Sequence, residues 1–386
     1  MGSRISRLET GPESVELGWE DGKRGEYHYM WLRDNCGCTD CRHPDTWERL
    51  FDLLTVPEDI KPVQAKITEA GDLRLTWPGD GHVSDYPTGW LRENCYAGDV
   101  DIEKVSRSQW DSALTGKLPE ASHGAVLADD AAFLAWLTAL RQWGVALLRD
   151  MPSDLGAARA FAENIGPLRP TNFGTEWNVI SMPNPNSNAY TDLKLTCHTD
   201  LPNWEVPPGY QFLHCLVNEA EGGQSVLVDG FRVAEELRAT EPEAFDLLSR
   251  VPLDYRFRDK DTDIYYRAPA IRLGPDGEVT EIRFSIAVMG TLKVPGHLMA
   301  GVYGAHRKFA QLLRDPRFEV RFRLDPGDMM VFDNRRVLHG RTAFNASTGH
   351  RRLRGIYVDH DVLDSRIRVL QHTANGMAAT GTGGPG

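Results

Sequence analysis

The sequence predicts an α+β protein, mainly β, in which a small β-rich N-terminal domain precedes a double-stranded β-helix, or jelly roll. Short segments that alternate apolar and polar residues dominate the chain after Pro170, with helical patterns between them. Three cysteines crowd into the stretch Cys36–Cys41 of the N-terminal part. Many short strands with helices packed outside are typical of a jelly roll, and a thin β domain gains stability from a bound metal.

Length and composition fit a protein of two domains. The 386 residues suffice for one large domain and a small one, and 41% hydrophobic with 25% charged residues is usual for a globular chain. No apolar run approaches a membrane span, and Met1–Arg4 lacks the apolar stretch of a signal peptide, so we expect a cytoplasmic protein without a membrane partner. The net charge of -12 argues against a nucleic-acid partner.

Changes in composition divide the chain into four parts. We expect an N-terminal β domain at 1–100, a polar linker with a short helix at 101–128, the jelly roll at 129–372 and a disordered tail at 373–386. The tail is rich in Gly, Ala and Thr, a composition that offers no core.

The N-terminal domain is predicted from alternation and turn residues. Val15–Trp19 alternates like a strand, Asp21-Gly22 follows as a turn, and Tyr27–Leu32 is expected to be the partner strand. A further strand is expected at Leu73–Trp77.

The cysteines Cys36, Cys38 and Cys41 form a C-x-C-x2-C pattern that favours a metal site over disulfides in a cytoplasmic protein. Three thiolates and one imidazole complete a closed, structural Zn(II) site. The fourth ligand is either His82, just after the strand at Leu73–Trp77, or His43, which is nearer in sequence.

The larger domain begins with helices and continues mainly as strands. Asp129 is expected to cap a helix that ends near Gly144, and Gly166-Pro167 stops a second one. The expected helices and strands after Asp129 are, in order, a helix to Gly144, a strand at Val145–Leu148, a helix at Ser153–Ile165, strands at Tyr210–Leu213 and Ser225–Val228, a helix at Val233–Ser249, a strand at Val279–Phe284, a helix at Ala300–Arg314, and strands at Val320–Leu324 and Met329–Phe332.

Two distant segments carry the candidate catalytic residues. His198 and Asp200 lie one residue apart, so at a strand end their side chains point the same way. His339 could complete the set from another strand. Two histidines and one carboxylate on one face of a metal form the facial triad of non-haem Fe(II) oxygenases, whose open positions take a chelating cosubstrate and O2. The alternative for a lone His-x-Asp is an ordinary surface or capping pair.

Nearly the whole chain resembles the taurine-dioxygenase-like Fe(II)/2-oxoglutarate oxygenases and, within them, the γ-butyrobetaine hydroxylases. The motifs that carry the resemblance are Trp31–Cys36 with the cysteines after it, Leu195–Asp200, Gly222-Gly223, Val228–Phe231, Phe332–Arg335 and Leu338–Arg341. The resemblance implies that His82 is the fourth zinc ligand and His339 the last iron ligand. It also implies that 2-oxoglutarate and O2 are consumed, that succinate and CO2 are released, and that an unactivated C–H bond is hydroxylated.

The distal carboxylate of 2-oxoglutarate needs a cation, and an arginine fork suits it best. The motif of the family, an Arg followed four residues later by Gly, selects Arg351 with Gly355. Strand alternation agrees, because Arg351 and Tyr357 would share a face from which Arg352 and Arg354 point away. The spacing from His339 leaves Arg352 open as the alternative. Ser225 is a candidate contact for the other end of the cosubstrate.

The resemblance also implies a substrate site. Its aromatic cage for a trimethylammonium group corresponds to Phe173, Trp177, Tyr190 and Tyr357, and cation–π contact suits a cation that cannot donate hydrogen bonds. Such rings are otherwise ordinary core residues. The asparagines with which the family binds the substrate carboxylate correspond to Ser187 and Ser285, so the anionic end of the substrate can differ here.

We therefore expect a hydroxylase of a small trimethylammonium acid, acting on the carbon two bonds from nitrogen. By resemblance the default reaction converts γ-butyrobetaine to carnitine, and the close alternative hydroxylates (2-trimethylammonio)ethylphosphonate. Trimethyllysine is a more distant alternative, and a non-catalytic binding module on the same fold is a different class. The resemblance suggests a homodimer.

Overall fold

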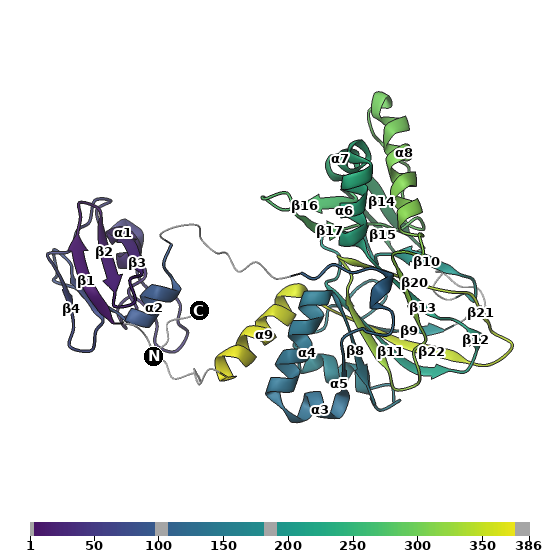
Figure 1. Cartoon of the computed structure of the whole chain (residues 1–386), viewed down its shortest axis with the longest axis horizontal. Coiled ribbons are helices and arrows are strands. Elements are labelled where there is room, and N and C mark those ends of the chain that lie inside the picture. Colours follow the sequence, from purple (N-terminus) through teal and green to yellow (C-terminus); the bar gives the residue numbers. More distant parts are fainter. Residues whose placement is uncertain (1–3, 97–106, 181–190, 375–386) are drawn as a thin grey trace. The chain divides into compact units, whose positions relative to one another are not determined.

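The computed structural model describes residues 4–96, 107–180 and 191–374, and Figure 1 shows them. The described residues form two compact units, the first within residues 4–96 and the second within residues 107–374. Within the described ranges, no helix is long and apolar enough to cross a membrane.

The N-terminal unit consists of two three-stranded antiparallel sheets. Its elements are β1 (Ile5–Thr10), β2 (Ser14–Trp19), β3 (Arg24–His28), α1 (Tyr29–Asp34), the 3-10 turn η1 (Leu53–Thr55), β4 (Gln64–Ile67), β5 (Leu73–Thr76), β6 (Val83–Tyr86) and α2 (Thr88–Glu93). Leu17, Leu32 and Leu73 meet in its core. This small core sits beside the cysteine cluster.

The strand expected at Tyr27–Leu32 ends at His28, so the prediction is wrong for its last four residues. Tyr29, Leu32 and Arg33 of α1 are buried. Their spacing of three and four residues places them on one face of a helix, and the alternation of the same segment also fits a strand. Packing into the core decides in favour of the helix.

A six-stranded sheet forms one wall of the second unit. Its order is β7 (Glu120–Ser122), β8 (Val145–Arg149), β19 (Met329–Asp333), β11 (Tyr210–Asn218), β22 (Arg351–Val358) and β9 (Glu176–Ile180). All neighbouring strands are antiparallel except β7 and β8.

A four-stranded antiparallel sheet forms the opposite wall. Its order is β10 (Leu195–His198), β20 (Val337–Arg341), β13 (Ser225–Asp229) and β18 (Glu319–Phe322). Leu213 and Phe332 of the larger sheet share a core with Leu227 and Val320 of the smaller one. Two antiparallel sheets around one core make the predicted jelly roll.

Helices cover the outer face of the six-stranded sheet (Figure 1). They are α3 (His123–Ala128), α4 (Asp130–Trp143), α5 (Ala157–Glu163) and α9 (His360–Ala374). Asp129 caps α4 by accepting hydrogen bonds from the backbone N–H groups of Ala131 and Ala132 at 3.2 and 3.1 Å, and Gly144 ends the helix at φ 70°. Both ends agree with the sequence prediction.

A second group of elements packs around a separate core at one end of the smaller sheet. It comprises α6 (Gly230–Thr240), α7 (Pro242–Arg250), β14 (Leu253–Arg258), β15 (Asp263–Ala268), β16 (Ile271–Leu273), β17 (Val279–Ile282) and α8 (Gly296–Leu312), while the small pair β12 (Glu221–Gly222) and β21 (Phe344–Asn345) lies elsewhere. The single helix expected at Val233–Ser249 is two helices, because Pro242 begins α7 and cannot continue α6.

The segment expected as a linker joins the second unit from residue 107 onward. It contains the 3-10 turn η2 (Ser112–Leu114), β7 and α3. Trp110 is buried, its backbone N–H donates to Asp229 Oδ2 at 3.1 Å, and its indole N–H donates to the Trp143 carbonyl at 2.8 Å. At the other end α9 extends to Ala374, and the tail at 375–386 lies outside the described residues.

Candidate active site

The jelly roll brings His198, Asp200 and His339 together. His198 ends β10 and lies directly opposite His339 of β20 in the register. Asp200 Oδ1 lies 3.2 Å from His198 Nε2 and 3.7 Å from His339 Nε2. One donor atom from each residue falls within 4.8 Å of the others, which is the spacing needed to hold a single ion.

Neighbouring groups fix the carboxylate of Asp200. Asn334 binds both sides of the Asp200 backbone, because its Oδ1 accepts from the N–H at 2.7 Å and its Nδ2 donates to the carbonyl at 3.0 Å. The Tyr357 hydroxyl donates to Asp200 Oδ2 at 2.6 Å. Oδ1 is thereby directed toward the two imidazoles, as an oriented metal ligand requires.

The charges of the cluster suit a cation. Burial lowers the pKa of His339 to about 4, so this imidazole is neutral at pH 7. Burial alone would raise the pKa of Asp200, but the two histidines and Tyr357 outweigh it and hold that pKa below its usual value. Burial would lower the pKa of His198, yet its hydrogen bond to Asp200 outweighs burial and raises it. A bound metal would compete with a proton for the His198 imidazole.

The arginines of β22 divide between its two faces. Arg352 approaches Asn178 Oδ1 at 3.3 Å, and Arg354 forms an ion pair with Glu176 at 2.6 Å. Arg351 alternates with them and has no carboxylate partner within the described part of the chain. A cavity of about 590 Å³ opens beside Arg351 and the ring of Phe344.

Sequence reasoning missed Arg341, which follows His339 by two residues on β20 and shares its face. Arg341 is buried and donates to the carbonyls of Thr191 and Leu193 at 2.6 and 2.9 Å. The guanidinium groups of Arg341 and Arg351 lie over the Phe344 ring at 4.7 and 5.8 Å.

Burial, together with the charge of Arg341, lowers the pKa of Arg351 to about 10. Ser225, the other expected cosubstrate contact, pairs with Arg341 in the register and is buried. One buried guanidinium group, that of Arg341, and one partly buried, that of Arg351, favour an anionic ligand.

Only part of the expected aromatic cage falls within the described residues. The rings of Trp177 and Tyr357 lie 4.4 Å apart, and Trp177 rests against Gly355, where a Cβ atom would lie 2.3 Å from the indole. Phe173 makes an edge-to-face contact with Phe257 at 5.5 Å, and sequence reasoning had not selected Phe257. Ser285 is buried. The expected Ser187 and Tyr190 lie outside the described residues.

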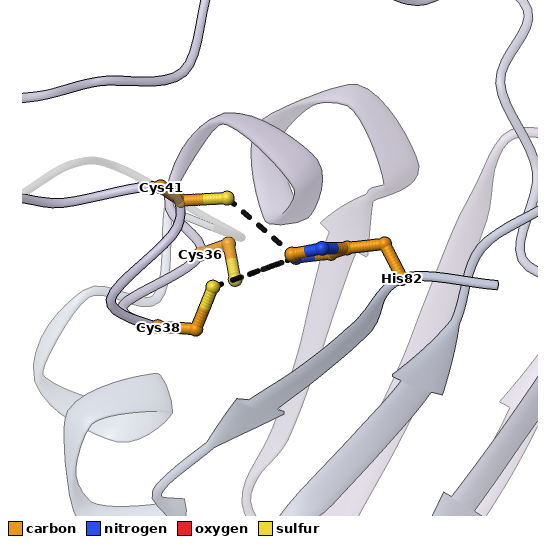
Figure 2. Close-up of side chains that lie close together, drawn as sticks. All are labelled: Cys36, Cys38, Cys41 and His82. Atoms are coloured by element: carbon orange, nitrogen blue, oxygen red, sulfur yellow. Dashed lines mark hydrogen bonds between the residues drawn. The ribbon is translucent and has the colours of Figure 1, made fainter. Parts of the chain in front are cut away.

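The N-terminal unit brings Cys36, Cys38, Cys41 and His82 together, as Figure 2 shows. The three Sγ atoms lie 3.4, 3.6 and 3.5 Å from His82 Nε2. Thiolate and imidazole ligands of a tetrahedral zinc ion lie about 3.5 Å apart, so the donor set fits Zn(II).

The alternative fourth ligand, His43, has another environment. Its Nδ1 accepts hydrogen bonds from the backbone N–H groups of Asp45 and Thr46, both at 3.2 Å. Burial raises the pKa of Cys41 to about 12 and lowers that of His82. Such thiols become thiolates when a cation binds, which is the expected effect of zinc on its ligands.

In this jelly roll, adjacent strands of the smaller sheet carry two imidazoles, and one carboxylate lies beside them. This arrangement defines the class of non-haem Fe(II) oxygenases. The sequence model of the family described as "Taurine catabolism dioxygenase TauD, TfdA family" matches residues 112–357, and that described as "Gamma-butyrobetaine hydroxylase-like, N-terminal" matches residues 6–92. The chain belongs to this dioxygenase family.

Similar proteins align over almost the full chain. γ-Butyrobetaine dioxygenase of Pseudomonas sp. (strain AK-1) is 43% identical and covers 92% of this chain and 94% of its own. Human γ-butyrobetaine dioxygenase is 33% identical, covering 97% and 100%, and the human mitochondrial trimethyllysine dioxygenase is 33% identical, covering 89% and 82%. The expected resemblance is confirmed, and the protein is an Fe(II)- and 2-oxoglutarate-dependent dioxygenase that acts on a small molecule.

Proposed function

We propose that the enzyme hydroxylates a small trimethylammonium acid at the carbon two bonds from nitrogen, with γ-butyrobetaine as its substrate and carnitine as its product. The observation that carries the proposal is the double contact of Tyr357, whose ring packs on Trp177 and whose hydroxyl binds Asp200. An aromatic surface joined to the metal carboxylate would hold a quaternary ammonium group at a fixed distance from the iron. The 43% identity with a γ-butyrobetaine dioxygenase supports this substrate.

In this proposal His198, Asp200 and His339 bind Fe(II) through two neutral imidazoles and one carboxylate. The bound Fe(II), with 2-oxoglutarate and O2, supplies the oxidation of an unactivated C–H bond. Tyr357 keeps Asp200 Oδ2 engaged, so that Oδ1 stays available to the metal. The aromatic rings also exclude water from the site.

We propose that Arg351 holds the distal carboxylate of 2-oxoglutarate and that Ser225 contacts the other end of the cosubstrate. The support for Arg351 over Arg352 is that Arg352 already contacts Asn178 and lies on the opposite face of β22. Arg341 adds positive charge next to Ser225. The aromatic ring of Phe344 beneath both guanidinium groups would restrict their orientation.

The Arg351→Ala variant should bind 2-oxoglutarate much more weakly than the natural protein. Loss of one partner from a buried charge pair costs about 2–5 kcal/mol, which corresponds to roughly 30-fold or more in Kd and a similar rise in KM for the cosubstrate. Anaerobic titration of the Fe(II) protein with 2-oxoglutarate measures the Kd of the cosubstrate. Arg352→Ala is the matched control, and a larger effect in that variant would assign the anchor to Arg352.

Serines stand at positions 187 and 285, where the resemblance implies contacts to the anionic end of the substrate. We propose that Ser187 and Ser285 contact it, with Phe173 and Tyr190 completing the cage around the ammonium group. A carboxylate is planar, whereas a phosphonate is tetrahedral and more negative and needs more donors. The named relatives support the carboxylate, and two serines in place of asparagines leave more room for the larger anion.

A substrate panel tests the proposed function directly. We expect succinate release to depend on γ-butyrobetaine, with a higher kcat/KM than for (2-trimethylammonio)ethylphosphonate or trimethyllysine, because the cage fixes nitrogen while the anion site selects the other end. The kcat/KM values for all three compounds are measured side by side on one preparation. A strong preference for the phosphonate would replace the substrate, and turnover of none of these compounds would reject the cage.

We propose that the N-terminal unit, residues 1–100, binds one structural Zn(II) at Cys36, Cys38, Cys41 and His82. The support is the fit of the donor set to a closed tetrahedral site. A cytoplasmic location, a homodimer, and the lack of nucleic-acid and membrane partners stay predictions.

A further inference from the structure

The loop that follows Asp200 has an unusual need for hydrogen-bond donors. It runs from Leu201 to Pro208 and contains three prolines, at 202, 207 and 208. Proline has no backbone N–H, and the loop belongs to neither sheet, so its carbonyl groups find few partners within the backbone. Side chains from other elements must therefore hold this loop.

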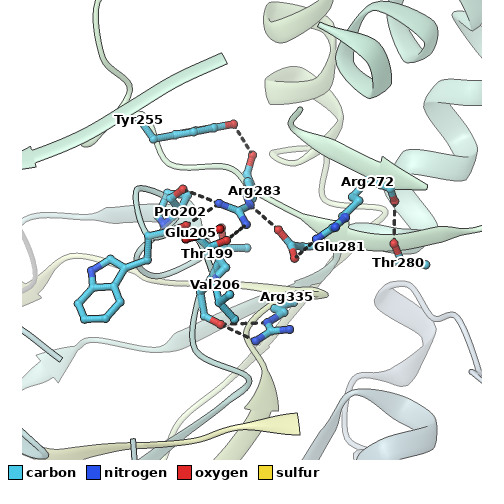
Figure 3. A network of polar contacts seen from close by, with 12 residues as sticks. Thr199, Pro202, Glu205, Val206, Tyr255, Arg272, Thr280, Glu281, Arg283 and Arg335 are labelled. Carbon is cyan, nitrogen blue, oxygen red and sulfur yellow. Dashed lines mark hydrogen bonds and ion pairs between the residues drawn. The ribbon is translucent and has the colours of Figure 1, made fainter. Parts of the chain in front are cut away.

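Arg283 supplies three of these hydrogen bonds. Its Nη1 donates to the carbonyls of Pro202 and Trp204 at 3.1 and 2.7 Å, and its Nη2 donates to the Glu205 carbonyl at 2.8 Å (Figure 3). The remaining Nε donates to Glu281 in a buried ion pair. Arg283 itself is only 3% exposed, so its donors face the loop and Glu281 rather than water.

The backbone around Arg283 is also joined to the residue before Asp200. The Thr199 N–H donates to the Phe284 carbonyl at 2.8 Å, and the Phe284 N–H donates to Thr199 Oγ1 at 3.0 Å. The carbonyl of Arg283 accepts from the Tyr255 hydroxyl at 2.8 Å. Asp200 thus lies between two segments that contact residues 283–284.

The far end of the loop is held in the same manner. Arg335 donates to the Pro207 carbonyl at 3.0 and 2.7 Å, and Arg169 donates to the Val206 carbonyl at 2.6 Å. Leu201, the first residue of the loop, has φ 55°, a conformation that costs energy for a side chain of this size. The contacts of the loop must offset this cost at the residue adjoining the metal ligand.

We propose that Arg283 is a positioning residue that fixes the carboxylate of Asp200 for Fe(II) by holding the loop after it. The proposal rests on the proposed function in one respect, namely that Asp200 binds the iron. Loosening the loop would let Leu201 relax and turn Asp200 away from the two histidines. Iron affinity would fall, and 2-oxoglutarate consumption would separate from substrate hydroxylation.

The Arg283→Lys variant tests this role. Lysine keeps the charge beside Glu281 but cannot reach three carbonyl groups with a planar fork. We expect Fe(II) to bind about 10–100-fold more weakly in an anaerobic titration, as when other outer partners of metal ligands are removed. We also expect less hydroxylated product per succinate. Wild-type iron affinity and coupling in this variant would overturn the proposal.

Arg323→Lys is the matched control. Arg323 likewise donates to three carbonyls, those of Asn218, Ala220 and Gly222, where the chain turns from β11 into β12, and this segment carries no residue of the metal cluster. Its replacement should lower the melting temperature without changing iron affinity. An equal loss of iron affinity in both variants would show a general loss of structure and would overturn the specific role of Arg283.

Two further variants separate the possible failures. If Arg283→Lys does not fold, Glu281→Gln removes the charge that orients Arg283, and an unchanged iron affinity there would also overturn the proposal. Asp200→Ala tests the iron site itself. Retained Fe(II) binding in Asp200→Ala would reject the proposed iron site, whereas its loss together with normal binding in Arg283→Lys would reject the positioning role alone.

Discussion

The His339→Ala variant is expected to lose Fe(II) binding and turnover while retaining zinc. His339 projects from β20 into the interior, opposite His198, and no other His, Cys, Asp or Glu of the described ranges joins this cluster. Removing one of three ligands should cost more than the roughly 10–100-fold that loss of an outer partner costs. Anaerobic Fe(II) titration and succinate release measure the two effects, and His198→Ala should behave in the same way.

A matched histidine variant controls for general damage. His123 lies on α3, where its ring contacts Phe161 on the outer side of the larger sheet. His123→Ala should bind Fe(II) normally, even if its melting temperature falls. Normal activity in His339→Ala would contradict the assignment of the iron ligands.

Replacing Cys38 with serine is expected to unfold much of the N-terminal unit. Structural zinc sites contribute about 10–16 kcal/mol of apparent binding free energy, which is also folding free energy. The unit has only two three-stranded sheets and a small core to compensate for this loss. Elemental analysis should show one zinc per natural chain after iron is chelated, and limited proteolysis of Cys38→Ser should cut within residues 1–104.

Cys95→Ser is the control for this variant, because Cys95 belongs to the same unit but lies outside the metal cluster. It should keep its zinc and its resistance to protease. A Cys38→Ser protein that lacks zinc but resists protease as well as the natural chain would argue against a structural role. Zinc-free natural protein would argue against the site itself.

Local sequence patterns predict an element correctly where a single local effect, such as helix capping or strand alternation, determines its structure. Asp129 and Gly144 delimit α4 because capping and left-handed backbone depend on the residue itself. The alternation of β22 separates Arg351 from Arg352, because successive side chains of a strand point to opposite faces. Prediction is weaker at Tyr27–Leu32, where one pattern fits a strand and a helix alike.

The contacts that complete the site depend on residues far apart in the sequence. Three sets of hydrogen bonds join different elements. Tyr357 donates to the Asp200 side chain, Asn334 binds the Asp200 backbone, and Arg283 donates to carbonyls of the following loop. No periodicity or spacing encodes such pairs, because they arise only when the two sheets close. The metal ligands are easier to predict, since iron chemistry restricts the residue types that can serve.

The placement of β10 at the edge of its sheet has a consequence for the lifetime of the protein. Among the described strands, β10 pairs with β20 alone, and its register is interrupted between Leu195 and His198. A short edge strand with an interrupted ladder opens at low energetic cost. An ion bound by both His198 and His339 would cross-link the two strands and stabilise their pairing.

The cellular supply of iron would then determine more than the rate of hydroxylation. A chain without bound iron would open first at β10. This opening would expose the segment that carries His198 and Asp200. Such a chain would be the preferred target of quality-control proteases, since degradation follows the population of open forms. Scarcity of iron would thus reduce the amount of enzyme as well as its occupancy.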